Sequence, residues 1–158
     1  MLYITYLIIC ICFDRYGYHI TKASYFICHD QGTIKKLFEN LRNYDGKNNY
    51  PKTCGRFEIS GIRDLTTGYD DSQPDKKAVL PTSKSSQMIT FTFANGGVAT
   101  MRTSGTEPKI KYYSELCAPP GNRYDTDNST CDSYSLKFLT GSVQMLSKTF
   151  CLPSMYFY

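Results

Sequence analysis

The clearest pattern of apolar and polar positions lies in the second half of the chain. Residues 88–93 alternate between the two kinds, a turn of polar and glycine residues follows at 95–97, and a second alternating run covers 98–102. Two such runs around an Asn-Gly pair predict a β-hairpin with a primed turn. Residues 110–116 supply a third strand, separated from the hairpin by a polar loop.

The first half of the chain contains one helical pattern. Four apolar residues follow the i, i+3, i+4, i+7 spacing of a single helix face: Ile34, Leu37, Phe38 and Leu41. Thr33 stands just before them and is the expected N-cap, because its hydroxyl can accept a backbone hydrogen bond. Turn-forming residues at 43–46 predict the end of this helix.

The segment between the helix and the hairpin predicts one further strand and a long loop. Phe57 and Ile59 alternate with polar residues, so we expect a strand that ends near Asp64. Residues 68–86 are rich in Asp, Ser, Pro and Lys, which predicts a surface loop with at most a short extended piece at 78–80. The expected fold class is α+β, a small antiparallel sheet with a helix packed on one face.

Both ends of the chain differ from this central region. Residues 1–13 form an apolar run that is shorter than the roughly 20 residues of a membrane-spanning helix. The run also lacks the basic start and the cleavage site of a signal peptide, so a buried strand or non-native sequence are the alternatives. Residues 123–158 show no sustained strand or helix pattern, and we expect a poorly ordered tail there.

Charge and cysteine content narrow the possible functions. The 158-residue chain has a net charge of +4, and its basic residues are mostly interleaved with acidic ones, which disfavours a nucleic-acid-binding face.

Seven cysteines at irregular spacings, with two histidines and no CxxC pair, indicate neither a disulfide framework nor a zinc site. Reduced thiols of a cytoplasmic protein are the simpler interpretation. Residues 17–29 alternate loosely and end in a β-type run at 25–28. Adjacent residues on a strand point to opposite faces, which argues against Cys28 and His29 as a nucleophile and its base.

The loop at 102–109 has the composition of a small-anion site. Gly105 would let the backbone turn its amides toward a ligand, Ser104 and Thr106 add hydroxyl groups, and Arg102 and Lys109 supply positive charge from the flanking strand ends. The spacing is not that of a P-loop, and no helix follows. From the residues alone, a phosphate site and an ordinary polar turn both remain open.

A resemblance to a known family favours the phosphate site. The run RTSGTEPKIKYY resembles the phosphate-binding loop of the fourth, carboxyl-terminal domain in the α-D-phosphohexomutase superfamily. YGYHITKASYFICHD and YYSELCAPPGN also resemble this family, in its phosphopentomutase and phosphoglucomutase branch, and the resemblance covers about residues 16–122. It implies four segments: a divergent start at 1–15, the end of a preceding domain or a linker at 16–29, the phosphohexomutase domain at 30–122, and a divergent tail at 123–158.

The resemblance also implies a role for the loop. In the intact family enzyme a phosphoserine exchanges phosphate with a sugar phosphate, while the fourth domain holds the phosphate that is not reacting. The implied contacts come from Arg102, Ser104, Gly105 and Thr106, with Lys109 as a helper. Lys111 is expected to lie farther from the anion, and Glu107 to be solvated or paired with a lysine. The implied partners are a sugar phosphate and the remaining mutase domains.

Three family motifs do not occur in these residues: the TASHNP-like catalytic serine, the DxDxD-type magnesium loop and the EExxG-type sugar loop. We therefore expect no catalytic residue, no metal site and no mutase activity in this chain alone. Magnesium and a sugar bisphosphate activator are implied for the full-length enzyme. The family's last helix is not recognisable after Asn122, so the expected product is truncated or alternatively spliced, with an incomplete carboxyl-terminal domain. A fragment of a glucose-1,6-bisphosphate synthase, a regulatory or non-functional fragment and a membrane-tethered product are the alternatives.

Overall fold

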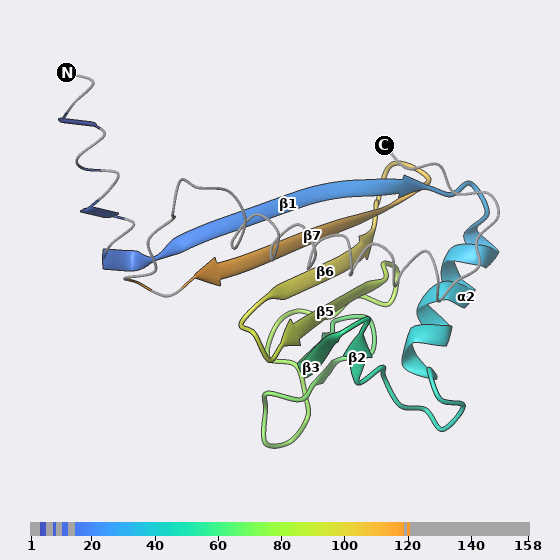
Figure 1. The fold of residues 1–158 in the computed structure, drawn as a ribbon. Helices are drawn as coiled ribbons and strands as arrows, with labels where there is room; N and C mark the ends of the chain where they lie inside the picture. The colour runs from blue at the N-terminus through green and yellow to red at the C-terminus, as the bar shows by residue number, and fades with distance from the viewer. Residues whose placement is uncertain (1–3, 6–7, 9–10, 13–14, 119, 121–158) are drawn as a thin grey trace.

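A single antiparallel sheet organises the chain (Figure 1). The computed structural model describes residues 4–5, 8, 11–12, 15–118 and 120. The strands of the sheet are β1 (Tyr18–Ile27), β2 (Thr53–Cys54), β3 (Phe57–Asp64), β4 (Tyr69–Asp70), β5 (Met88–Phe93), β6 (Val98–Thr103) and β7 (Lys109–Ala118). Their order is β1-β7-β6-β5-β3-β2, with β4 paired to β3, and each pairing is antiparallel.

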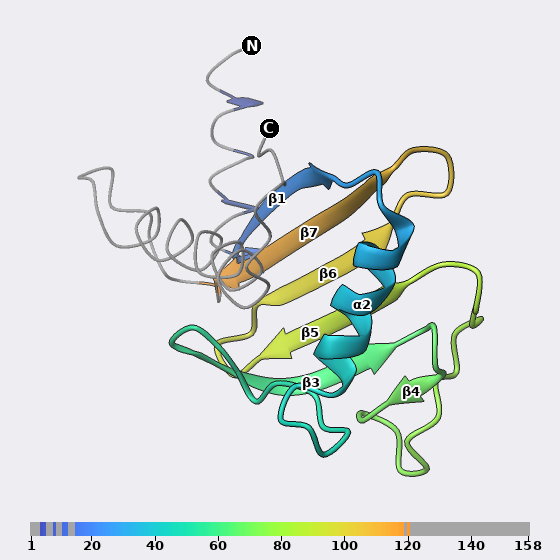
Figure 2. The ribbon, with the colours of Figure 1, turned by 90° about the vertical axis from the view of Figure 1, so that its right-hand side faces the viewer.

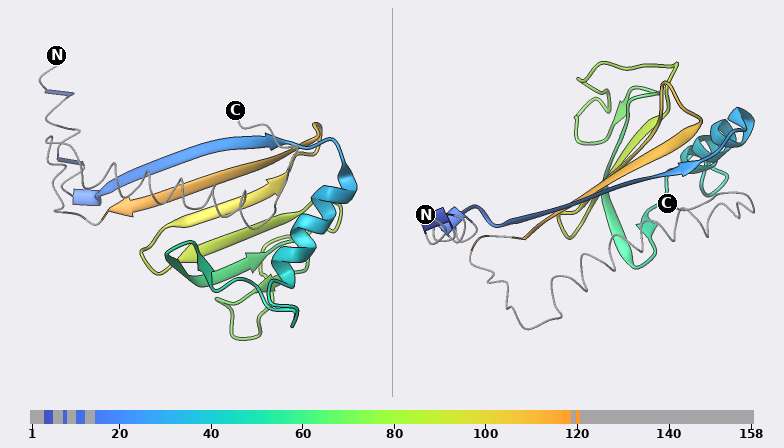
Figure 3. Two further views of the ribbon diagram at one scale, coloured as in Figure 1. Left: turned by 45° about the vertical axis from the view of Figure 1, so that its right-hand side comes forward. Right: turned by 90° about the horizontal axis from the view of Figure 1, so that it is seen from above.

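Helix α2 (Gln31–Arg42) lies across one face of this sheet (Figure 2). The two views of Figure 3 show the twist of the sheet and α2 beside it. The four apolar residues that predicted the helix are all buried: Ile34, Leu37, Phe38 and Leu41. They join a core whose sheet side includes Ile89, Phe91, Met101, Ile110 and Tyr112. The expected α+β fold class is confirmed. The sequence could predict it because one buried helix face needs apolar residues about every 3.6 positions, and one buried sheet face needs them every two.

The helix begins three residues before the position that the sequence indicated. Its N-cap is Asp30, whose carboxylate accepts hydrogen bonds from the amides of Gly32 at 3.2 Å and Thr33 at 2.8 Å. The Thr33 hydroxyl also contacts this carboxylate. Thr33 as N-cap was therefore wrong. A carboxylate that precedes the first turn satisfies two free amides at once, and Thr33 is then the third helical residue. The helix ends at Arg42, as predicted.

The predicted hairpin forms, with a different turn. Strands β5 and β6 pair in the register Met88↔Arg102 to Thr92↔Val98. The Gly96 amide donates to the Phe93 carbonyl at 2.9 Å, and the Phe93 amide donates to the Gly97 carbonyl at 2.8 Å. Of the turn residues 94–96, Gly96 alone has a positive φ, 81°. A primed turn needs positive φ at its first central position, so this is a type I turn followed by a glycine bulge.

The other expected elements fall close to their predicted bounds. Strand β3 ends at Asp64, as expected, and β7 extends beyond both ends of the predicted 110–116 run. The polar stretch at 68–86 contains the short strand β4 and an isolated bridge between Tyr69 and Lys77. Residues 78–80 form no strand, and Val79 is 80% exposed.

One charged residue is fully buried at the end of β3. The Asp64 carboxylate accepts from Arg42 Nε at 2.6 Å, the Tyr50 hydroxyl at 2.9 Å and the Thr66 amide at 2.9 Å. Burial acts to raise the pKa of Asp64, but these hydrogen bonds and the Arg42 charge outweigh it and leave the pKa below its usual value. The contacts tie the last turn of α2 to the sheet.

The segment before the helix contributes to the same sheet. Residues 16–29, expected as the end of a preceding domain or a linker, contain β1, which pairs with β7 from Tyr18↔Ala118 to Ile27↔Lys109. In the apolar start of the chain, the described positions 4–5, 8 and 11–12 are helical and exposed, so a buried strand is wrong for them. No helix among the described residues is both long and apolar enough to cross a membrane. The expected tail at 123–158 lies outside the described residues.

Candidate phosphate-binding site

The loop that the sequence selected connects β6 to β7 and is fixed by backbone hydrogen bonds. The Ser104 amide donates to the Lys109 carbonyl at 2.9 Å, which closes the loop across its base. On one side the Thr103 amide donates to the Gln87 carbonyl at 2.9 Å, and on the other the Cys28 amide donates to the Pro108 carbonyl at 2.9 Å. The loop is therefore anchored to the segments before β5 and after β1.

The tip of this loop presents free donors. Gly105 and Thr106 are exposed, and their amides have no hydrogen-bond partner in the described part of the chain. Gly105 does not have a positive φ, and a Cβ built there would meet nothing within 4 Å. A turn conformation thus does not require this glycine, contrary to the expectation from the sequence. Its remaining effect is that no side chain stands beside this exposed stretch of backbone.

Arg102 lies at the base of the loop, on the sheet face turned away from α2. The alternation along β6 buries Ala99 and Met101 toward the helix and exposes Arg102. Its Nη2 lies 3.4 Å from the Tyr113 hydroxyl, and its Cζ lies 5.6 Å from the centre of the Tyr113 ring. The hydrogen bond from Arg102 is the main cause that lowers the pKa of Tyr113.

Lys109 is already engaged by neighbouring side chains. Its Nζ lies 2.7 Å from Glu107 Oε2 and 4.5 Å from the centre of the Tyr25 ring, and the lysine side chain is 17% exposed. The hydrogen bond from Lys109 lowers the pKa of Glu107. Glu107 is thus paired with a lysine, one of the two placements expected for it. An anion that used the Lys109 charge would have to compete with this carboxylate.

A second basic residue, Lys111, lies next to Arg102 in the sheet. Lys111 is the direct cross-strand partner of Arg102, and Tyr25 pairs with Lys111 on its other side. Lys111 lies two residues farther along β7 than Lys109, as expected, but this pairing also makes it a neighbour of Arg102, and its smaller role in binding an anion stays a prediction. Arg102 and Lys111 are separated by a loop in the sequence, and only the β6–β7 register makes them neighbours.

Comparison with known proteins gives close relatives over part of the chain. No family model matches it. It is 95% identical over 108 residues to the protein named phosphopentomutase in Homo sapiens, which covers 68% of this chain and 18% of that protein. It is 67% identical over 108 residues to glucose 1,6-bisphosphate synthase of Homo sapiens, covering 68% and 17%. It is 52% identical over 105 residues to a probable phosphoribomutase of Schizosaccharomyces pombe, covering 66% and 18%.

A solved structure supports the fold. The crystal structure of parafusin, a phosphoglucomutase from Paramecium, in its open form, superposes with a TM-score of 0.50 and 13% identity, covering 94% of this chain and 24% of that one. At this identity the likeness concerns the fold alone. The chain spans about a fifth of the length of the curated relatives it matches. The matched part of the chain, about two thirds of its length, is therefore similar to one segment of these mutases, as a fragment of the phosphohexomutase family would be.

Proposed function

We propose that this chain carries the phosphate-clamp domain of a phosphopentomutase. In this proposal the loop between β6 and β7 binds the phosphate of a ribose, deoxyribose or glucose phosphate that is not being transferred. Two features support it best: Gly105 and Thr106 are exposed and their amides have no hydrogen-bond partner among the described residues, and the exposed Arg102 lies at the base of the same loop. Backbone amides and a guanidinium are donors well suited to phosphate oxygens.

The clamp supplies binding and orientation rather than chemistry. Holding the remote phosphate lets its binding energy position the reacting end of the sugar against the phosphoryl donor. Arg102 is expected to contribute most, since a guanidinium can donate two parallel hydrogen bonds to one anion. Lys111, its cross-strand neighbour, adds positive charge on the same face of the sheet.

Within the family, the pentomutase is favoured over the bisphosphate synthase. The identity over the same number of residues is 95% to the former and 67% to the latter. The loop itself does not distinguish them, because the clamp contacts the phosphate group that pentose and hexose phosphates share.

The test is an NMR titration of the whole chain, isotopically labelled, with inorganic phosphate and then with ribose 5-phosphate. A single domain supplies only part of the binding cleft, so we expect it to bind phosphate with a dissociation constant of about 1 mM. This corresponds to a binding free energy of about −4 kcal/mol. Amide shifts should centre on Ser104, Gly105 and Thr106. Arg102→Ala should weaken binding by about tenfold or more, because a hydrogen bond to a charged group contributes about 1.5–3 kcal/mol to the binding free energy.

Two further variants sharpen this test. Glu107→Gln should tighten binding, because it removes the carboxylate that pairs with Lys109 at 2.7 Å. Arg56→Ala is the matched control, an exposed arginine in the turn between β2 and β3, and should bind like the unchanged protein. If Arg102→Ala and Arg56→Ala weaken phosphate binding equally, general charge attraction explains the binding and the clamp proposal is wrong. No saturable shift in the unchanged chain would favour a non-functional fragment.

A further inference from the structure

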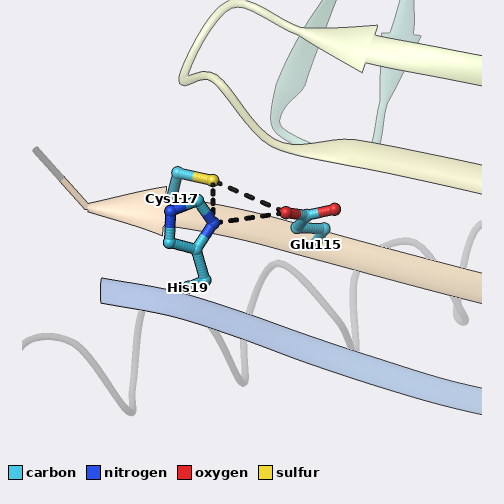
Figure 4. A group of neighbouring side chains, drawn as sticks. All are labelled: His19, Glu115 and Cys117. Atoms are coloured by element: carbon cyan, nitrogen blue, oxygen red, sulfur yellow. Dashed lines mark hydrogen bonds and ion pairs between the residues drawn. The ribbon is translucent and has the colours of Figure 1, made fainter. Parts of the chain in front are cut away.

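Three side chains with metal-binding atoms meet near the far end of the β1–β7 pair (Figure 4). His19 lies directly opposite Cys117 in the register of these strands. Glu115 precedes Cys117 by two residues, so both side chains of β7 point to the same face of the sheet. Figure 4 shows the imidazole, the carboxylate and the thiol converging on one point.

Their separations are close to those of a coordination shell. His19 Nδ1 lies 3.0 Å from Cys117 Sγ and 3.3 Å from Glu115 Oε1, and Sγ lies 3.7 Å from Oε1. In a tetrahedral zinc site with Zn–S of about 2.3 Å and Zn–N or Zn–O of about 2.0–2.1 Å, neighbouring donor atoms lie about 3.3–3.6 Å apart. Only the nitrogen–sulfur distance must widen, by about half an ångström, and both side chains are exposed and can move.

The geometry points to a divalent transition-metal site of the zinc class, formed by His19 Nδ1, Glu115 Oε1 and Cys117 Sγ. Thiolate, imidazole and carboxylate together are a typical zinc set, whereas magnesium and calcium prefer oxygen ligands alone. Three protein ligands leave the fourth tetrahedral position for water. Binding would release the thiol proton, because the thiolate is the form that coordinates a metal.

The position of the cluster suggests what a bound ion would do. Pairing of β6 with β7 reaches as far as Val98↔Glu115, so among the described strands the β7 residues after Glu115 pair with β1 alone. A two-stranded ribbon is held more weakly than the centre of a sheet. An ion bridging His19 to Glu115 and Cys117 would join these two strands and stabilise the end of the ribbon.

No local sequence motif indicates this site. His19 and Cys117 lie 98 positions apart, and the prediction of no zinc site relied on the short ligand spacings of common zinc motifs. Antiparallel pairing of two distant strands brings the three ligands together instead. Hydrogen bonds among the three side chains, with no metal involved, are the competing explanation that an experiment has to separate from coordination.

Cobalt provides a direct spectroscopic test on the whole chain, kept reduced with a reductant that contains no thiol. One equivalent of Co²⁺ should give a sulfur-to-cobalt charge-transfer band, and Zn²⁺ should displace it. Cys117→Ser should abolish the band. His19→Gln and the near-isosteric Glu115→Gln should each weaken Zn²⁺ binding by about tenfold or more, since loss of outer-shell partners already costs 10–100-fold.

Cys28→Ser is the matched control. Its thiol contacts the Asp30 carbonyl at 3.5 Å beyond the other end of β1, and its loss should leave the band unchanged. Zn²⁺ should also raise the melting temperature of the unchanged chain and of Cys28→Ser, and leave that of Glu115→Gln nearly unaffected. A band that survives Cys117→Ser, or no band in the unchanged chain, would overturn the proposal and leave a hydrogen-bonded cluster.

Discussion

The buried Asp64 carboxylate gives the most demanding test of what holds α2 to the sheet. Asp64→Asn keeps the shape of the side chain, removes its charge and turns an amide toward the Arg42 guanidinium. The unchanged carboxylate accepts from Arg42 Nε at 2.6 Å, the Tyr50 hydroxyl at 2.9 Å, and the Thr66 and Thr67 amides at 2.9 and 3.2 Å. The asparagine oxygen can satisfy only part of this set.

The expected cost is large compared with the stability of a domain. Removing one member of a buried ion pair costs about 3–5 kcal/mol, because the partner stays buried without compensation. The Arg42 side chain is 18% exposed and can reach some water, which places the estimate near the lower end, about 3 kcal/mol. Total stabilities are about 5–15 kcal/mol, so the variant should unfold at a clearly lower urea concentration.

The assay is urea unfolding followed by circular dichroism, at neutral and at acidic pH. The folded state lowers the pKa of Asp64 below its ordinary value of 3.8, so its stabilisation is fully present above that value and is lost as the pH falls through the folded pKa. The stability difference between the unchanged protein and Asp64→Asn should therefore narrow below about pH 4.

A matched substitution separates this effect from the loss of any carboxylate. Glu39→Gln removes an exposed charge that lies 3.8 Å from Lys35, a pair expected to contribute about 0.2–0.5 kcal/mol. A cost below about 1 kcal/mol for Asp64→Asn would contradict the reasoning, since it would equal that of a surface pair. A difference that stays constant in acid would show that the charge of Asp64 is not the cause.

Two further substitutions test local features of the backbone by the same unfolding assay. Asp30→Ala removes the acceptor of two first-turn amides and should cost about 0.5–2 kcal/mol; an unchanged midpoint would mean that another group caps α2. Gly96→Ala forces a Cβ into a residue with φ of 81° and should cost about 1–2 kcal/mol, although nothing lies within 4 Å of that Cβ. Gly105→Ala is its control, with the same open space and no positive φ, and equal losses in the two variants would refute the turn assignment.

Side-chain periodicity carried most of the fold prediction. Helix α2 and strands β3, β5, β6 and β7 were predicted because burying one face of an element requires apolar residues to recur every 3.6 or every two positions. The cap and the turn were less well predicted. Asp30 and Thr33 are both good capping residues, and an Asn-Gly pair is compatible with more than one hairpin turn, so competing local hydrogen bonds decided each case.

The sequence by itself determined the elements, the buried helix face and the composition of the loop at 102–109, because these depend on residues close together in the chain. Only the tertiary structure decided which side chains are neighbours. The β6–β7 register placed Lys111 beside Arg102, and the β1–β7 register joined His19 to Cys117. Shifting a strand by one residue would turn every side chain to the opposite face, so both clusters depend on the pairing of distant strands rather than on any local pattern.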